Sequence, residues 1–362
     1  MNKRTYLVSA SAIAMSAALV AGSLASSPAK AVDITDNIAL DFIYETTYGF
    51  VDASEPVQPT NAVDSDILTD GEVHLGASFD TDDGYTIGAK VELGSAQSST
   101  NNADELYAYV SGGFGRVEVG DQDGAADKLA WGVPNVGYGQ IDGDYSDFAG
   151  PGANVAITES GDDTKITYYT PSFNGITLGA SFAPADDEGS NIVTTQGEEE
   201  NQIELGLSFG QSVNDIDVEI GLAYFQDNQE AGAEDFGAWS AGINFTVQDF
   251  TFGIGHMDNG DGGATTAGDD VTGTAAGVTY SMGAMEFGLS YVTNDNSALT
   301  AQDSEIYGAG FNYEWQPKVN GNTPVTVNFA ADIVRFDQDA SNNGATAANS
   351  GTIGILFTSV EF

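Results

Sequence analysis

The sequence contains no cysteine and very few basic residues. Among its 362 residues are 9 Lys or Arg and 54 Asp or Glu, so the formal net charge is −45. Without cysteine, disulfides, thiolate metal sites and thiol catalysis are excluded. So strong a negative charge repels phosphate groups, which argues against nucleic acid as a partner.

Long hydrophobic runs are also missing beyond the first thirty residues. The absence of any later stretch of 18 apolar residues excludes a helical membrane protein. At the start, two basic residues precede a mostly apolar run, 7–24, and the Ala-Lys-Ala sequence at 29–31. This layout predicts a cleaved secretory signal peptide over 1–31; the alternative, an uncleaved membrane anchor, is disfavoured by the Ser and Gly residues in the run. Cleavage removes three basic residues and no acid, which leaves 6 basic and 54 acidic residues and a charge of −48 in 32–362.

Apolar and polar residues alternate with a period of two in many short segments. The composition, with 45 Gly, 15 Tyr and 19 Phe, agrees with strands joined by many turns. The alternating segments are 37–50, 72–79, 84–94, 105–111, 114–120, 164–170, 175–182, 202–209, 217–225, 236–247, 249–257, 274–282, 285–292, 305–315, 323–336 and 351–362.

The connections between these segments alternate between long, polar ones and tight ones. This arrangement predicts an all-β fold, a 16-stranded antiparallel up-and-down transmembrane β-barrel. Closure of the sheet pairs every backbone N–H and C=O, as the lipid interior demands. In 202–209, for example, Ile203 and Leu205 are expected to face lipid while Glu204 faces the lumen. A soluble β-sandwich is the competing fold, but it rarely needs so many long strands.

The final segment, 351–362, is apolar on both faces. It is expected to be the closing strand, with Phe362 in the aromatic girdle at the barrel end. Ile353, Ile355 and Phe357 crowd the face expected to be lumenal. That face could pack against an inward-folded loop or against a neighbouring subunit, and the sequence leaves both open.

Two stretches resemble the trimeric general porins of Gram-negative outer membranes. LYAYVSGGFGRVEVGDQDGAADKLAWG, 106–132, resembles the strand, turn and strand that lead into the third loop of porins. YYTPSFNGITLGASF, 168–182, resembles the following hairpin, and the terminal Phe362 resembles the porin assembly signal. Gly120-Asp121 is most similar to alphaproteobacterial porins. The resemblance implies a homotrimer of 16-stranded barrels in the outer membrane, each with the third loop folded into its lumen.

The connection 121–163 is more than forty residues long, and loops of such length are usually functional or disordered. If it folds inward it forms a pore constriction. Acidic groups in a pore wall favour cations, so we expect cation selectivity; the alternative is that these acids only solvate a loop. The candidate constriction residues are Asp121, Asp123, Asp127, Asp142, Asp144 and Asp147 in the loop, with Lys90, Arg116 and Lys165 on strand positions that can point into the lumen and Arg335 as a fourth candidate cation.

Acidic turns suggest a second prediction, which is bound Ca²⁺. Asp121 and Asp123, and Asp142 and Asp144, offer clustered oxygen ligands, although neither pair matches an EF-hand loop. No cofactor is expected to be required. The other long, acidic connections could bind divalent cations that bridge to lipopolysaccharide, or could adapt the surface to saline water.

The sequence thus predicts a passive channel for small hydrophilic solutes and cations, and no enzyme. The two histidines, His74 and His256, lie in strand patterns with no serine singled out as a nucleophile. Glycine-rich runs are attributed to turns and close strand packing rather than to phosphate binding. Two alternatives remain: a solute-selective channel with an aromatic slide that includes Tyr138 and Tyr145, and a secreted, acidic, β-rich surface or adhesive protein.

Overall fold

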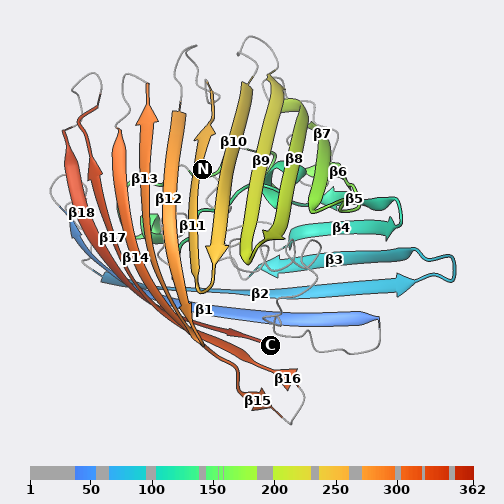
Figure 1. Ribbon diagram of the computed structural model, residues 1–362, viewed down its shortest axis with the longest axis horizontal. Coiled ribbons are helices and arrows are strands. Elements are labelled where there is room, and N and C mark those ends of the chain that lie inside the picture. The colour runs from blue at the N-terminus through green and yellow to red at the C-terminus, as the bar shows by residue number, and fades with distance from the viewer. Residues whose placement is uncertain are drawn as a thin grey trace.

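The computed structural model describes residues 37–53, 65–94, 103–137, 144–153, 155–157, 159–185, 199–229, 236–260, 271–297, 303–319, 323–341 and 347–362. They form one closed barrel of 16 strands, confirming the predicted fold (Figure 1). The barrel strands are β1 (Ile38–Ala53), β2 (Ser65–Asp80), β3 (Thr86–Gly94), β4 (Ala103–Gly112), β5 (Gly115–Asp121), β6 (Thr164–Tyr169), β7 (Ile176–Ala185), β8 (Glu199–Val213), β9 (Ile216–Gln229), β10 (Phe236–Val247), β11 (Phe250–Asp258), β12 (Val271–Met282), β13 (Met285–Asn296), β14 (Ser304–Trp315), β17 (Thr326–Gln338) and β18 (Asn349–Glu361).

Each barrel strand pairs antiparallel with its neighbours in the sequence, and β1 pairs with β18 to close the sheet. The short strands β15 (Lys318–Val319) and β16 (Thr323–Pro324) form a separate hairpin in the connection between β14 and β17. The short helices α2 (Ala125–Lys128) and η1 (Asp144–Asp147) both lie between β5 and β6. Among the described residues, no helix is long and apolar enough to cross a membrane.

Several strands are longer than their alternation predicts, and β2 shows the reason. The sequence assigns 65–71 to a connection, whereas these residues extend β2 and pair with 44–50 of β1. The segment SDILTDG carries little apolar pattern because two of its inward positions, Asp66 and Asp70, are acidic. Period-two hydrophobicity therefore misses a strand segment whose side chains are mostly polar.

The tight connections are built by residues that tolerate left-handed backbone. Between β8 and β9, Asn214 and Asp215 have φ of 51° and 63°. Two consecutive residues with positive φ form the type of two-residue turn whose twist matches a β-hairpin. The turn places β8 and β9 in register from Val213 and Ile216 onwards.

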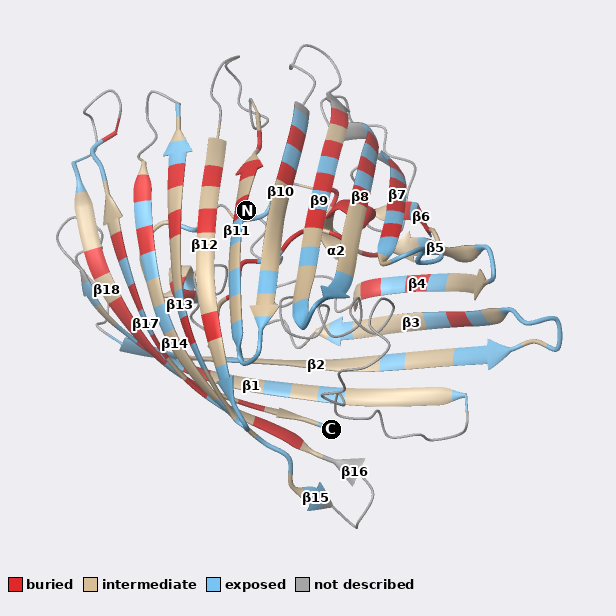
Figure 2. Cartoon of the chain, viewed as in Figure 1, coloured by how far each residue is buried: buried red, intermediate tan, exposed pale blue. Residues whose placement is uncertain are grey.

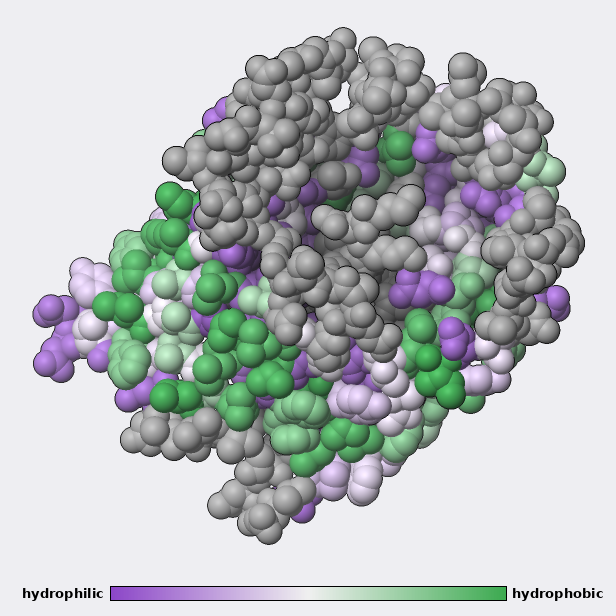
Figure 3. Space-filling model, turned by 180° about the vertical axis from the view of Figure 1, so that it is seen from behind, coloured by the Kyte–Doolittle hydropathy of each residue, from purple (hydrophilic) through white to green (hydrophobic). Residues whose placement is uncertain are grey.

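Inner and outer faces of the barrel alternate along the strands. Ile203 and Leu205 are exposed on the outer face, as predicted, while Glu204 between them is buried on the inner face. Figure 2 shows buried and exposed positions alternating along β8 and β9. From behind, hydrophobic side chains gather over the outer wall (Figure 3), as expected of a surface that meets lipid.

The seam between β1 and β18 ends at Phe362. The Phe42 N–H donates to the Phe362 carbonyl at 2.8 Å, and the Phe362 N–H donates back to the Phe42 carbonyl at 3.1 Å. The two rings contact each other with centroids 5.1 Å apart. The terminal residue thus lies in the closing pair, where the sequence predicts it.

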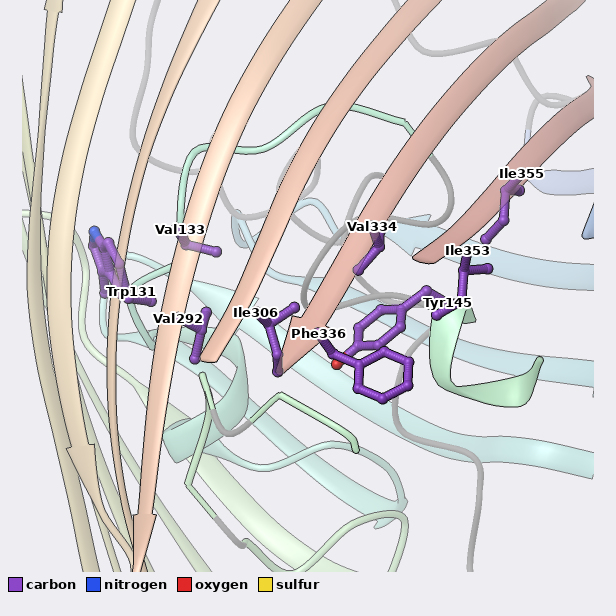
Figure 4. Close-up of a cluster of buried hydrophobic side chains, with 10 residues drawn as sticks. Trp131, Val133, Tyr145, Val292, Ile306, Val334, Phe336, Ile353 and Ile355 are labelled. Carbon is purple, nitrogen blue, oxygen red and sulfur yellow. The ribbon is translucent and has the colours of Figure 1, made fainter. Parts of the chain in front are cut away.

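A hydrophobic core lies inside the barrel. Ile353 and Ile355 of β18 project inward and pack in one buried cluster with Tyr145, which comes from the long connection between β5 and β6 (Figure 4). Val334 and Phe336 of β17 belong to the same cluster. Of the two explanations left open for the apolar inner face of β18, the inward-folded loop is therefore the one that the structure supports.

Candidate functional site

The candidate site is the lumen, which is occupied in part by the connection between β5 and β6, hereafter the inner loop (122–163). Its first turn is α2, in which Ala125 and Ala126 are completely buried. The Ala125 N–H donates to Ser181 Oγ of β7 at 2.7 Å, and the Ala126 N–H donates to Glu204 Oε2 of β8 at 3.0 Å. Side chains of the barrel wall therefore satisfy the free N–H groups at the start of this helix.

Glu204 also holds the far end of the inner loop. Its Oε1 accepts a hydrogen bond from the Ser160 N–H at 3.0 Å and another from the Ser160 hydroxyl. One buried carboxylate thus ties residues 126 and 160 to the same point of the wall. Because its acceptor positions are filled by three donors, the buried charge is well compensated.

Glycines on the inner face make room for the loop. A Cβ atom added at any of them would lie within 3 Å of inner-loop atoms, which is closer than real Cβ contacts. From the sequence, these glycines are predicted to serve turns and close strand packing. That prediction is wrong here, because inner-loop atoms occupy the space that a side chain would fill. They are Gly179, Gly206, Gly221, Gly242, Gly253, Gly255, Gly277, Gly288 and Gly310, at least one on each strand from β7 to β14, and are hereafter called the glycine track.

Trp131 is the largest side chain seated on this glycine track. Its backbone and ring lie over Gly221, Gly242 and Gly255 of three adjacent strands. The indole Nε1–H donates to Asn244 Oδ1 at 2.7 Å, and Asn244 Nδ2 donates to the Gly132 carbonyl at 3.1 Å. Shape and hydrogen bonding together fix the position of the loop.

The opposite wall, made by β2 to β5, is charged. Lys90 and Arg116 lie on the inner face there, as predicted. Lys90 forms an ion pair with Glu92, and Arg116 pairs with Glu118 and lies over the ring of Tyr109, 3.6 Å from its centroid. Both cations of the wall are therefore matched by acids two residues away on their own strand.

The inner loop contributes its own cation to the same wall. Lys128 Nζ lies 3.7 Å from Glu105 Oε1 and 3.8 Å from Glu118 Oε2, over the Tyr107 ring. Although burial lowers the pKa of Lys128, the neighbouring Glu105 and other anions raise it above its ordinary value. This lysine remains charged while it joins the loop to the acidic wall.

Lys165 has the inward direction that strand parity predicts, but it does not line the open lumen. Its side chain is 1% exposed beneath the inner loop, and its ammonium group donates to the carbonyls of Gln122 and Gly161. Asp121, another predicted constriction residue, accepts a hydrogen bond from the Thr164 hydroxyl beside the strand ends. These two residues anchor the base of the loop.

Several acids of the inner loop hold protons more tightly than usual. Burial, reinforced by Glu159, raises the pKa of Asp127 to about 7. Burial and the charge of Glu204 raise the pKa of Glu159 to about 8, and burial with Asp123 raises the pKa of Asp162 to about 8. Part of the loop's formal negative charge is therefore neutralised below pH 7.

The remaining predicted residues are placed as follows. Asp147 is exposed in η1, next to Phe148, which covers Gly49 of β1.

Tyr145 is fully buried and its hydroxyl donates to the Pro151 carbonyl, so the aromatic-slide prediction is wrong for this residue. Asp142, Tyr138 and the side chain of Asp144 lie outside the described residues. Arg335, the fourth candidate cation, is exposed on the outer face and pairs with Asp337.

Three carboxylates could hold a hard cation beside the loop. Oxygen atoms of Glu105, Asp123 and Asp162 lie within 4.8 Å of one another, and burial with the neighbouring Asp127 raises the pKa of Asp123 well above its ordinary value. Of the two predicted Ca²⁺ ligands whose side chains the structure describes, Asp121 and Asp123, Asp123 belongs to this group. Calcium binding stays a prediction.

The sequence pattern places Glu204 in the lumen but does not identify it as a residue that holds the loop, and no sequence-based prediction singles out Glu92, Glu105 and Glu118. Each occupies an inward position of an alternating segment, and that parity is the signal that identifies them. The wall against which the long loop docks is therefore recognised from the alternation of the strands and not from the loop.

Comparison with known proteins gives a consistent result. A family model described as Gram-negative porin matches residues 10–353. A monosaccharide porin of a Halomonas species and the major outer membrane protein of Halomonas elongata are each 26% identical over 193 residues, which are 50% of this chain and 52% of each relative. The match thus spans about half the length of these curated relatives.

Solved structures share the fold at low sequence identity. A porin structure refined at 1.8 Å has 16% identity and a TM-score of 0.61, and the alignment covers 90% of this chain and 100% of that one. An anion-selective porin from Comamonas acidovorans has 18% identity and a TM-score of 0.60, with 90% and 99% covered. A doubly substituted mutant of the Rh. blastica porin has 17% identity and a TM-score of 0.60, with 90% and 100% covered.

Proposed function

We propose that this chain, which belongs to the family of Gram-negative porins, forms a water-filled channel in the outer membrane for ions and small hydrophilic solutes. The family and the fold are those of channel proteins, not of enzymes. The observation that carries the proposal is a closed barrel whose inner loop is fixed to one side of the lumen by Glu204 and by the glycine track. Solutes would diffuse passively through the space between the loop and the charged wall.

We further propose that the channel is cation-selective. On the described part of the charged wall, Lys90 is paired with Glu92 and Arg116 with Glu118, and Lys128 lies between Glu105 and the same Glu118. The cations of this region are therefore neutralised, and the remaining acids set the sign of the potential. The porin from Comamonas acidovorans is anion-selective and shares the fold, so the fold alone does not fix the sign.

A bilayer reversal potential under a KCl gradient tests the selectivity. The expected potential has the sign of K⁺ preference, and Glu105→Gln should lower it because one wall charge is removed. Asp82→Asn, in the exposed turn between β2 and β3, is the matched control and should leave it unchanged. An anion preference of the wild-type channel would contradict the proposal.

A narrower function is a solute-selective channel, favoured by the similarity to the Halomonas monosaccharide porin. Tyr107 and Tyr109 lie on the inner face of β4 and offer aromatic surface near Arg116. Swelling of proteoliposomes in monosaccharides and in neutral polyols of equal size separates the two functions. Equal rates support a general channel, and saturable uptake of one sugar supports the narrower function.

We propose that the chain reaches the outer membrane through a cleaved signal peptide, assembles as a homotrimer and contacts lipid and lipopolysaccharide there, without a required cofactor. Outer-membrane fractionation with heat-modifiable migration in SDS gels tests the location and the fold. A secreted, acidic surface protein, the alternative from another class, would appear in the medium and would migrate identically before and after boiling.

A further inference from the structure

We propose that Glu72, His74 and Glu92 form a binding site for a first-row transition-metal cation, with Zn²⁺ as its probe, on the inner wall of the barrel. These residues belong to β2 and β3, and in the described part of the chain their ion pairs are with one another and with Lys90. The proposal concerns metal binding and stands whether or not the channel prefers cations.

The three side chains converge from adjacent strands. His74 is the direct cross-strand partner of Glu92, and Glu72 lies two residues before His74 on the same face. His74 Nε2 is 2.7 Å from Glu72 Oε2 and 3.6 Å from Glu92 Oε2. One nitrogen and two carboxylate oxygens therefore surround a single point, all within 4.8 Å of one another.

The site is formed but open to the lumen. The side chains of His74, Glu72 and Glu92 are 15%, 16% and 13% exposed, so most of their surface is packed and each keeps some contact with solvent. The neighbouring Leu75 is 41% exposed on the outer face, which fixes the opposite direction for His74. A metal bound here would have three protein ligands and at least one position facing solvent.

The donor set selects a class of metal. Imidazole nitrogen with carboxylate oxygens suits Zn²⁺ and its neighbours, whereas Ca²⁺ and Mg²⁺ prefer oxygen ligands alone. The group of Glu105, Asp123 and Asp162 offers oxygen only and is the contrasting case within this chain. The two clusters should therefore differ in metal preference.

The surrounding charges permit a divalent cation. Lys90 binds the other oxygen of Glu92, Oε1, and leaves Oε2 directed to His74. Against this one cation, Asp41 and Glu361 add two negative charges whose fields reach His74. Together with Glu72 and Glu92, these groups give the surroundings of His74 a net negative charge.

Isothermal titration of the detergent-solubilised full-length protein with Zn²⁺, in excess Ca²⁺ to occupy sites made of oxygen alone, tests the proposal. We expect one saturable site per chain in the wild type, loss of that site in His74→Ala and weaker binding in Glu92→Gln. His256→Ala is the matched control and should bind as the wild type does. His256 belongs to β11 and contacts Thr274 and the Trp239 ring on the outer face.

Heat-modifiable migration of each variant verifies that the barrel is intact. If His74→Ala does not fold, Glu92→Gln carries the test, since amide substitution preserves size. The absence of saturable Zn²⁺ binding in the wild type would overturn the proposal. So would binding that survives in folded His74→Ala, or binding that is lost only in His256→Ala.

Discussion

Replacing Gly242 by alanine should push the inner loop off the barrel wall. Gly242 lies on the inner face of β10, under the ring of Trp131. A Cβ atom at this position would lie 2.2 Å from Cδ2 and 2.3 Å from Cγ of that ring. Carbon atoms in contact are usually separated by about 3.5–4.0 Å, so the ring must move by about 1–2 Å.

The size of the effect follows from what this movement disrupts. Overpacking of a well-filled interior costs about 1–3 kcal/mol, and displacement of the indole breaks its hydrogen bond to Asn244, worth about 1 kcal/mol. The loop should shift toward the centre of the lumen and fluctuate there. We expect a smaller single-channel conductance with more current noise.

Two controls make the test specific. Gly76→Ala changes another inner-face glycine, one with no neighbouring atom within 4 Å of the added Cβ, and should conduct as the wild type does. The double variant Trp131→Ala/Gly242→Ala removes the clash and should recover conductance relative to Gly242→Ala alone. Wild-type conductance and noise in Gly242→Ala would refute the argument that the glycine track positions the loop.

Three further perturbations probe the same architecture. Glu204→Ala leaves three donors without their acceptor, at about 1–3 kcal/mol each, so the temperature of the heat-induced gel shift should fall, and fall less in Glu204→Gln; an unchanged shift temperature would contradict this role. Because the pKa values of Asp127, Glu159 and Asp162 are raised to about 7–8, the folded loop binds protons that the unfolded loop has lost, and its anchoring should weaken as pH rises from about 4 to above 8. Current noise and protease cleavage of the loop should increase over that range, and a decrease would show the opposite linkage. Deletion of Phe362 should lower the yield of heat-modifiable barrel while export continues, and an unchanged yield would rule out its closing role.

The strands could be predicted from the sequence because lipid outside and water inside impose alternation on each of them. The prediction failed where this contrast is absent, as at 65–71, where acidic residues extend β2. The alternation also predicts that Lys165 points inward, but it does not predict that Lys165 is buried. A strand pattern carries no information about what covers the inner face of the strand. The sequence predicts turns and close strand packing at its glycines, whereas Gly242 and its counterparts accommodate a segment distant in the sequence, a pairing visible only in three dimensions.

The apolar inner face of β17 and β18 links the closed barrel to the loop inside it. Val334, Phe336, Ile353 and Ile355 are buried in one cluster with Tyr145 and other residues of the inner loop. A barrel that closed while empty would expose these side chains to lumenal water, at roughly 1.5–3 kcal/mol for each fully buried residue. Loop insertion and the pairing of β18 with β1 therefore stabilise each other.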